Sequence, residues 1–224
     1  MIALSRYQLA VLLRSHRWIP PAVLYALAVA GLGGGSPPLG DGLRWSALML
    51  VPAVAWLTRS ALIAEPDAAR ACVAAAGGPR RAQLAALTAA LLIGAGYAVL
   101  GVGYELPASR LPASPAGAVR VAATFSVLGG GLTATLICLL VGSAVGALCN
   151  PPLVRPPAAA MLSTTAAVVL ALASNVSPAN AAARTVGTAP QISSWLPGLP
   201  VIAAVALLAV AWAVSALAAG HRGG

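Results

Sequence analysis

Lysine is absent from this sequence. All 13 basic residues are arginines, and with only four acidic residues they give a formal net charge of +9. A Walker A loop needs a lysine to hold the nucleotide phosphates, and a Schiff base needs a lysine amine. Both kinds of site are therefore excluded. We expect no ATP hydrolysis from this chain alone, and we predict that it is not an enzyme.

Ionisable residues are also missing from the middle of the long apolar stretches. Ion-driven carriers and proton relays need such a residue at mid-membrane, and metal or haem sites need several ligands close together. The three cysteines, Cys72, Cys138 and Cys149, have no metal-binding spacing. We therefore predict no metal, no cofactor and no disulfide. The acids and histidines lie at the edges of the apolar stretches or between them: Asp41, Glu65, Asp67, Glu105, His16 and His221.

Hydrophobic residues dominate what is present. They make up 60% of the chain, only 8% is charged, and the mean hydropathy is +0.91. A soluble domain cannot bury that much apolar surface, and the stretches approach the roughly 20 residues that a helix needs to cross a bilayer. We therefore predict an all-α membrane protein with residues 1–224 in a single transmembrane domain. Six spans are expected, at residues 20–34, 43–62, 82–104, 119–149, 157–173 and 198–219.

Residues 3–17 are predicted to form a helix that lies on the membrane surface. At 100° per residue, Arg6, Arg14 and Arg17 share one side of this helix, and apolar residues such as Leu12 occupy the other. The alternative is that this segment is an irregular start to the first span.

Arginine placement predicts the orientation. With the N-terminus in the cytoplasm, nine arginines fall on the inner side and four on the outer side, which favours six spans and two cytoplasmic termini. In a five-span alternative, residues 157–173 do not cross. Because the arginines stand mostly singly at span ends, we predict no nucleic-acid partner. The inner arginines are Arg6, Arg14, Arg17, Arg59, Arg70, Arg80, Arg81, Arg155 and Arg222, and the outer ones are Arg44, Arg110, Arg120 and Arg184.

The segment between the second and third spans carries the most specific pattern. A short helix is predicted over residues 66–76, because proline suits a first helical position and aspartate favours the positive helix start. Glycines end this helix, and a pair of arginines opens the next span. The alternative is an ordinary arginine-rich inner loop. The residues of the pattern are Glu65, Pro66, Asp67, Arg70, Gly77, Arg80 and Arg81.

This layout resembles the permease of ABC-2-type transporters, in which a connecting helix precedes six spans and a coupling helix lies between spans 2 and 3. In residues, the resemblance is concentrated in 59–84. The chain departs from the family in one respect. Its predicted coupling helix is rich in alanine and lacks the bulky apolar residues that commonly insert into the ATPase groove.

The resemblance implies a permease subunit in a bacterial cytoplasmic membrane, paired with a separate ABC ATPase subunit and with a second permease, identical or paralogous. The pattern residues named above would contact the ATPase, and the transported compound would be hydrophobic or amphipathic: a drug, natural product, peptide or lipid. Two alternatives stay open. One is a haem-export permease of cytochrome c maturation, and the other is a membrane scaffold that transports nothing.

Two further features lie inside the spans. Ser163, Thr164 and Thr165 form the most polar patch and could line a substrate path, although we favour hydrogen bonds from these hydroxyls to their own helix carbonyls. Residues 129–131 are three glycines in the middle of the long fourth span, and they predict a tilt or a break there.

Overall fold

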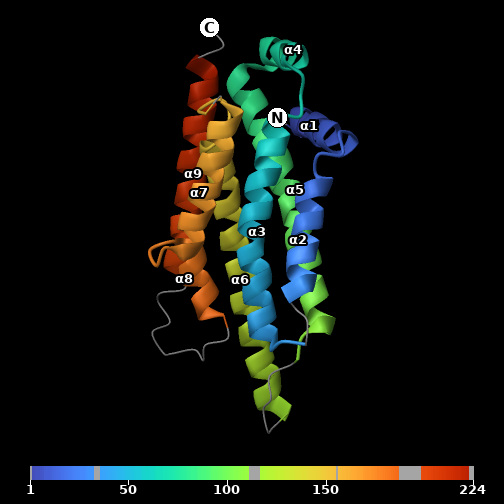
Figure 1. Cartoon of the computed structure of the whole chain (residues 1–224), viewed down its shortest axis with the longest axis vertical. Helices are drawn as coiled ribbons and strands as arrows, with labels where there is room; N and C mark the ends of the chain where they lie inside the picture. The colour runs from blue at the N-terminus through green and yellow to red at the C-terminus, as the bar shows by residue number, and fades with distance from the viewer. Residues whose placement is uncertain (1, 33–35, 111–116, 155, 187–197, 222–224) are drawn as a thin grey trace.

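The computed structural model describes residues 2–32, 36–110, 117–154, 156–186 and 198–221, with only the backbone described at residues 32, 67 and 117–122. These residues form α-helices joined by turns (Figure 1). The helices are α1 (Ile2–Arg14), α2 (Ile19–Leu32), α3 (Leu39–Leu62), α4 (Asp67–Gly77), α5 (Pro79–Ala108), α6 (Gly117–Leu148), α7 (Pro157–Ala173), α8 (Pro178–Thr185) and α9 (Gly198–His221).

The first predicted helix exists but is shorter than expected. The sequence predicted 3–17, whereas α1 ends at Arg14 and a turn over residues 15–18 leads to α2. His16 ends the helix because its φ of 55° is left-handed. α1 lies across the bundle rather than along it (Figure 1). It is therefore a separate element, not an irregular start to the first span.

Five segments have the length and apolarity to cross a membrane, rather than the six predicted. They are α3, α5, the described part of α6 from Ala123, the α7–α8 segment Pro157–Thr185, and α9. The described part of α2 has 14 residues, which rise about 21 Å against about 30 Å of hydrocarbon. The sixth crossing, expected at 20–34, therefore stays a prediction, and residues 33–35 lie outside the described part.

The other boundaries follow the predictions with specific differences. α7 begins and ends at the predicted residues, and α4 is shifted by one residue. α3 begins four residues earlier than expected, and α5 extends beyond both ends of the predicted 82–104. Helical hydrogen bonding does not have to stop where the apolar residues stop. α6 is continuous through the glycines at 129–131, so the predicted break is wrong.

The core forms around α3, which packs against α6 and α5. Gly142 and Gly146 of α6 lie directly against α3. A Cβ added at Gly142 would come within 2.8 Å of the Val51 carbonyl oxygen, and one at Gly146 within 2.5 Å of Thr58 Cβ. This GxxxG pair therefore permits close packing inside the chain.

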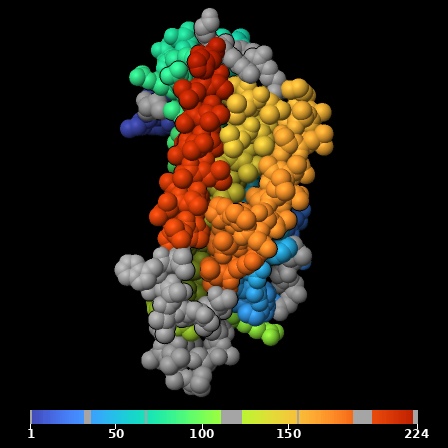
Figure 2. Space-filling view, turned by 90° about the vertical axis from the view of Figure 1, so that its left-hand side faces the viewer, coloured from blue at the N-terminus to red at the C-terminus, as the bar shows by residue number. Residues whose placement is uncertain are grey.

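The remaining spans are peripheral. Of the 18-residue apolar stretch that could cross a membrane, 78% is buried in α6 and 67% in α3, against 22% in α9. Figure 2 shows α9 running along the surface of the bundle. Side chains such as Ile202 and Val210 are exposed there. In a membrane protein, lipid covers such a surface.

One end of the bundle gathers α4, α1 and the C-terminal end of α9 (Figure 1). Gln83 near the start of α5 donates a hydrogen bond to Ser215 of α9 over 2.9 Å, and Leu4 of α1 lies close to Gly77 of α4. We call this the α4 end of the bundle. It holds most residues of the pattern found in the sequence.

Candidate functional site

A single glycine sets the direction of α4. Gly78 has a φ of 86°, a left-handed conformation that suits glycine, and its N–H donates to the Ala74 carbonyl over 2.8 Å. Pro79 then occupies the first turn of α5. α4 and α5 are thus separate helices joined by one residue, as the Gly-Gly-Pro sequence predicted.

Glu65 links the start of this segment to α1. Glu65 is only 7% exposed, and its carboxylate accepts hydrogen bonds from Tyr7 Oη over 3.1 Å and from Gln8 Nε2 over 3.0 Å. The bond to Glu65, followed by burial and the carboxylate charge, raises the pKa of Tyr7 above its ordinary value of 10.0. Glu65 is therefore engaged within the chain, where it holds α1 beneath α4.

Arg70 is also turned inward. Its guanidinium donates to the carbonyl oxygen of Leu62 in the last turn of α3. Arg17 donates to the next carbonyl, that of Ile63, over 2.6 Å. The last carbonyls of a helix have no partner within the helix and carry partial negative charge, so two arginines stabilise this end of α3.

The two arginines that open α5 are the exposed cations of the pattern. Arg80 packs against Gly220 of α9, and both Arg80 and Arg81 have solvent-accessible side chains. Pro66 is exposed and precedes α4 as its N-cap residue, and only the backbone of Asp67 is described. Of the charged side chains of the pattern that the structure describes, Glu65 and Arg70 thus face inward, and Arg80 and Arg81 face outward.

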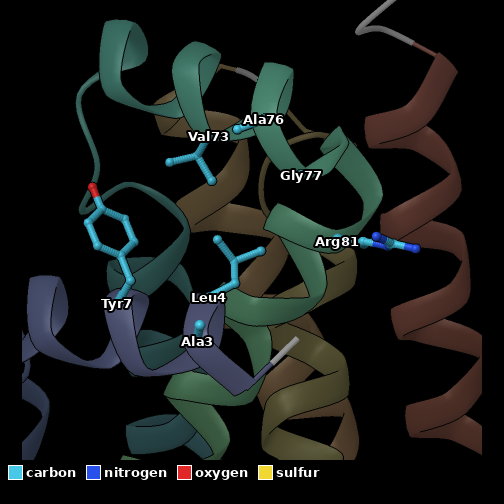
Figure 3. A pocket seen from close by; sticks show the side chains of 7 residues that line it. All are labelled: Ala3, Leu4, Tyr7, Val73, Ala76, Gly77 and Arg81. Carbon is cyan, nitrogen blue, oxygen red and sulfur yellow. The ribbon is translucent and has the colours of Figure 1, made fainter.

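A groove of about 420 Å³ separates α1 from α4. Figure 3 shows Leu4 pointing from α1 toward α4, and Val73 pointing back from α4. Arg81 is the charged residue of the lining and points away from Tyr7 (Figure 3). The lining residues are Ala3, Leu4, Tyr7, Val73, Ala76, Gly77 and Arg81.

Sequence reasoning missed the α1 residues of this site. Gln8 is 4% exposed, although a surface helix would be expected to expose a glutamine. One signal was available, because Gln8 falls about 200° from Arg6 and so lies on the apolar side of the helix. A polar residue on an apolar side needs a buried partner. That partner is Glu65, which is 57 residues further along the chain.

Two of the three hydroxyls of the α7 patch form hydrogen bonds to their own helix, as the favoured alternative predicts. Thr164 donates to the Ala160 carbonyl of its own helix over 2.6 Å, and Ser163 donates to the same carbonyl over 3.2 Å. Thr165 is exposed on the outer surface of the bundle. Thr164 also accepts a hydrogen bond from the fully buried Asn150 over 3.4 Å. Among the described residues, no contact places these hydroxyls along a route through the bundle.

Asn150 is a second residue that the sequence did not reveal. Its side chain accepts a hydrogen bond from Arg59 of α3 over 3.0 Å and donates to the Gly146 carbonyl over 2.8 Å. Gln83 of α5 lies 3.4 Å from the Pro151 carbonyl oxygen, to which it donates. This cluster ties α3, α5 and α6 together at the α4 end.

Glu105 lies near the end of α5, as its expected place at the edge of a span predicts, and it is buried there. It is 2% exposed and accepts a hydrogen bond from Ser109 over 2.9 Å. The opposing residue is Gly42, which leaves room for the carboxylate. Because 25 residues separate it from Arg80, Glu105 lies about 38 Å away along α5. It is therefore near the opposite end of the bundle and not at its middle.

Among the described residues, no three histidine, cysteine or acidic side chains come together as a metal site. All three cysteines are free. No known protein family, no curated protein and no solved structure matches this chain. The resemblance to ABC-2-type permeases therefore depends on the layout of the helices and on residues 59–84.

Proposed function

We propose that this chain is the membrane-spanning permease subunit of an ATP-driven ABC transporter. The observation that carries the proposal is the α4 end of the bundle. There a discrete 11-residue helix stands between two spanning helices, next to the exposed Arg80 and Arg81. In this proposal α4 is the coupling helix, and a separate ATPase subunit binds there on the cytoplasmic side.

The contacts of α4 give it the rigidity that coupling requires. Arg70 joins α4 to the end of α3, and Glu65 joins the preceding turn to α1. Gly78 joins α4 directly to α5. A displacement of α4 is therefore passed to three helices at once, because packed helices move as rigid units.

The charged residues of the spanning helices α3 and α5, including the buried Glu105, lie toward the helix ends. The uncharged middle of these helices supports export of a hydrophobic or amphipathic compound, such as a drug, natural product, peptide or lipid. Since one permease encloses only half of a transport path in this arrangement, a second permease copy or paralogue completes it. The proposed location is the bacterial cytoplasmic membrane, with both termini on the cytoplasmic side.

The test first asks whether a reading frame next to this gene encodes an ABC ATPase subunit. That subunit is then co-expressed with this chain, and its association is measured by co-purification. Reversing Arg80 and Arg81 to glutamate should leave the chain inserted but weaken association, because charge-assisted contacts contribute about 1.5–3 kcal/mol each when desolvated. Ala71→Pro should act through geometry, since proline inside a helix costs about 3 kcal/mol.

The matched control is Arg110→Glu. It reverses an exposed arginine just after the C-terminal end of α5, whereas Arg80 and Arg81 lie at the N-terminal end of the same helix. It should leave association unchanged. If the arginine reversal and Ala71→Pro both leave association and ATP-dependent transport intact, α4 is an ordinary connecting segment and the proposal fails.

A further inference from the structure

Arg59 is a half-buried arginine in the last turn of α3, at the α4 end of the bundle. Among the described residues, the acceptor within hydrogen-bond distance of its side chain is the Asn150 side-chain oxygen, over 3.0 Å. A guanidinium carries five N–H donors in a planar fork, and this bond uses one of them. The other donors of Arg59 can therefore meet an acceptor that the chain itself does not supply.

None of the described carboxylates neutralises Arg59. Glu65 is bonded to α1, and Asp41 lies 18 residues earlier in α3, which is about 27 Å along the helix. Glu105 lies near the opposite end of the bundle, and only the backbone of Asp67 is described. A partly buried charge without a counter-charge costs free energy, which an anion bound beside it would offset.

Asn150 orients the guanidinium and joins it to the hydroxyl patch of α7. Asn150 is fully buried, and its amide donates to the Gly146 carbonyl over 2.8 Å and to the Thr164 hydroxyl over 3.4 Å. One asparagine therefore holds Arg59 of α3 beside Thr164 of α7. Because the arginine is positioned before any ligand binds, less conformational freedom is lost on binding.

α7 borders this cluster and is open to the surrounding hydrocarbon. Of the apolar stretch in the α7–α8 segment, 11% is buried, which is the lowest share among the five candidate spans. Figure 2 shows α7 on the surface of the bundle. Large apolar side chains are exposed along it, among them Met161, Leu162, Val169 and Leu170. A hydrocarbon tail beside α7 would therefore meet an apolar surface, with a charged group at one end of it.

We propose that Arg59 binds the anionic head group of an amphiphile, a phosphate or a carboxylate, between α3 and α7 at the α4 end of the bundle. The inference rests on the proposed function and narrows the compound that the permease takes up to an anionic amphiphile. The guanidinium fork matches two oxygens of such a head group. The site is where the compound enters from the inner leaflet and not a route through the bundle.

The experiment measures equilibrium binding of n-dodecyl phosphate to the purified chain in phosphatidylcholine nanodiscs, corrected with empty nanodiscs. n-Dodecyl maltoside is the matched ligand, because it has the same tail and a neutral head group. Arg59→Gln removes the charge and keeps an amide donor for Asn150. Arg44→Gln is the matched variant, since it removes an exposed charge near the other end of the same helix.

We expect Arg59→Gln to bind dodecyl phosphate about ten-fold more weakly or worse, because the charge-assisted hydrogen bonds are lost. Arg44→Gln should remain within about three-fold of the parent. Arg59→Lys keeps the charge without the fork and should weaken binding about three-fold or more. None of these variants should change the binding of dodecyl maltoside.

A phospholipid head group offers the same chemistry as an exported amphiphile, so a second arm uses nanodiscs of phosphatidylglycerol, corrected with empty nanodiscs of that lipid. If the chain no longer binds dodecyl phosphate there, a lipid head group occupies the Arg59 site. If binding that depends on Arg59 persists, the site selects the free amphiphile. Either result supports an anion site at Arg59.

The contrary outcomes are distinct. If Arg59→Gln is folded by thermal unfolding and binds dodecyl phosphate like the parent, Arg59 only fastens Asn150 and the inference fails. If Arg59→Gln does not fold, unweakened binding by Arg59→Lys overturns it instead. Equal weakening by Arg59→Gln and Arg44→Gln would mean a general effect of positive charge, which also overturns it.

Failure of this inference and failure of the proposed function are separately visible. ATPase association that depends on Arg80 and Arg81, together with dodecyl phosphate binding that does not depend on Arg59, removes the anion site and leaves the proposed function. Binding that depends on Arg59, together with ATPase association that survives both the arginine reversal and Ala71→Pro, leaves the anion site and removes the proposed function.

Discussion

Glu65→Ala should release α1 from the α4 end of the bundle. In the folded chain this carboxylate is 7% exposed and accepts one hydrogen bond from Tyr7 and one from Gln8. Both donors belong to α1, and Glu65 lies in the turn before α4. The substitution removes both bonds together and leaves the buried Gln8 amide without its acceptor.

The magnitude follows from the two contacts. A hydrogen bond to a charged group contributes about 1.5–3 kcal/mol, and an unsatisfied buried polar group costs about 1–3 kcal/mol. The bond from Tyr7 is partly exposed, so its contribution belongs at the lower end. Docking of α1 should therefore weaken by about 3 kcal/mol or more, which is at least a hundredfold in the equilibrium between docked and released helix.

Hydrogen exchange measured by mass spectrometry on the chain in nanodiscs tests this expectation. The α1 amides should exchange faster in Glu65→Ala, because local opening of the helix becomes more frequent. Peptides from the centre of α3 should not change. Asp41→Ala is the control, since it removes an exposed acid at the other end of the bundle. Unchanged exchange in α1 would refute the reasoning.

The same variant should also alter the titration of Tyr7. The folded-state pKa of this tyrosine is raised chiefly by its bond to Glu65, so the contribution of that bond to docking is present below pH 10 and is lost as the pH rises through the raised value. Alkaline difference absorbance, assigned with Tyr7→Phe, should show the Tyr7 pKa falling toward 10 in Glu65→Ala. A Tyr7 pKa that does not move would contradict the assigned cause.

Three further predictions concern topology, packing and capping. Two single-cysteine chains test the topology, one with Val176→Cys and one that keeps only the native Cys72. A thiol reagent added outside intact cells should label Val176→Cys and not Cys72. External labelling of Cys72 would mean that the orientation is opposite to the predicted one. Gly142→Ala should destabilise the chain by about 1–3 kcal/mol in thermal unfolding, because the added Cβ meets α3. Gly129→Ala should have no such effect, because nothing lies within 4 Å of its added Cβ. Equal effects of the two substitutions would contradict the close packing of Gly142 against α3. Arg17→Met should destabilise the chain by about 1 kcal/mol in a thermal shift assay, because it removes one of the two arginines that cap the end of α3 and leaves Arg70 as the other. An unchanged melting temperature would exclude that role.

Proline and glycine mark the helix boundaries that the sequence predicted best. Pro157 opens α7, and the Gly77–Pro79 run separates α4 from α5. Prediction failed where the only signal was a change in hydropathy. The change in hydropathy predicts a span end at Tyr104 and Glu105, yet α5 continues to Ala108 and the Glu105 side chain lies against Gly42 of α3.

Glycines were harder to interpret because their role depends on what lies opposite. The three glycines at 129–131 predict a tilt or a break, but α6 has no break there and Gly131 lies against Leu43 of α3. The spacing of Gly142 and Gly146 does not by itself identify the helix that packs against them. The partner is α3, which no local pattern in α6 could have shown.

The amino-acid sequence by itself determined the class of the protein and the position of most helices. The excess of apolar residues indicates a membrane environment, where the backbone must satisfy its hydrogen bonds internally. Apolar stretches of roughly 20 residues then favour helices. Those are properties of composition and of short segments. They do not depend on how the helices come together.

Only the tertiary structure decided which charged residues of 65–81 face inward. In the sequence, Glu65 and Arg70 resemble Arg80 and Arg81, since all four are charged residues within or next to the short helix α4. Glu65 is buried because Tyr7 and Gln8, which belong to α1, donate to its carboxylate. Arg70 is engaged because α4 folds back onto the end of α3, where the Leu62 carbonyl accepts its hydrogen bond. A side chain is turned inward when a partner offsets its loss of water, and here the partners are brought together by packing between helices.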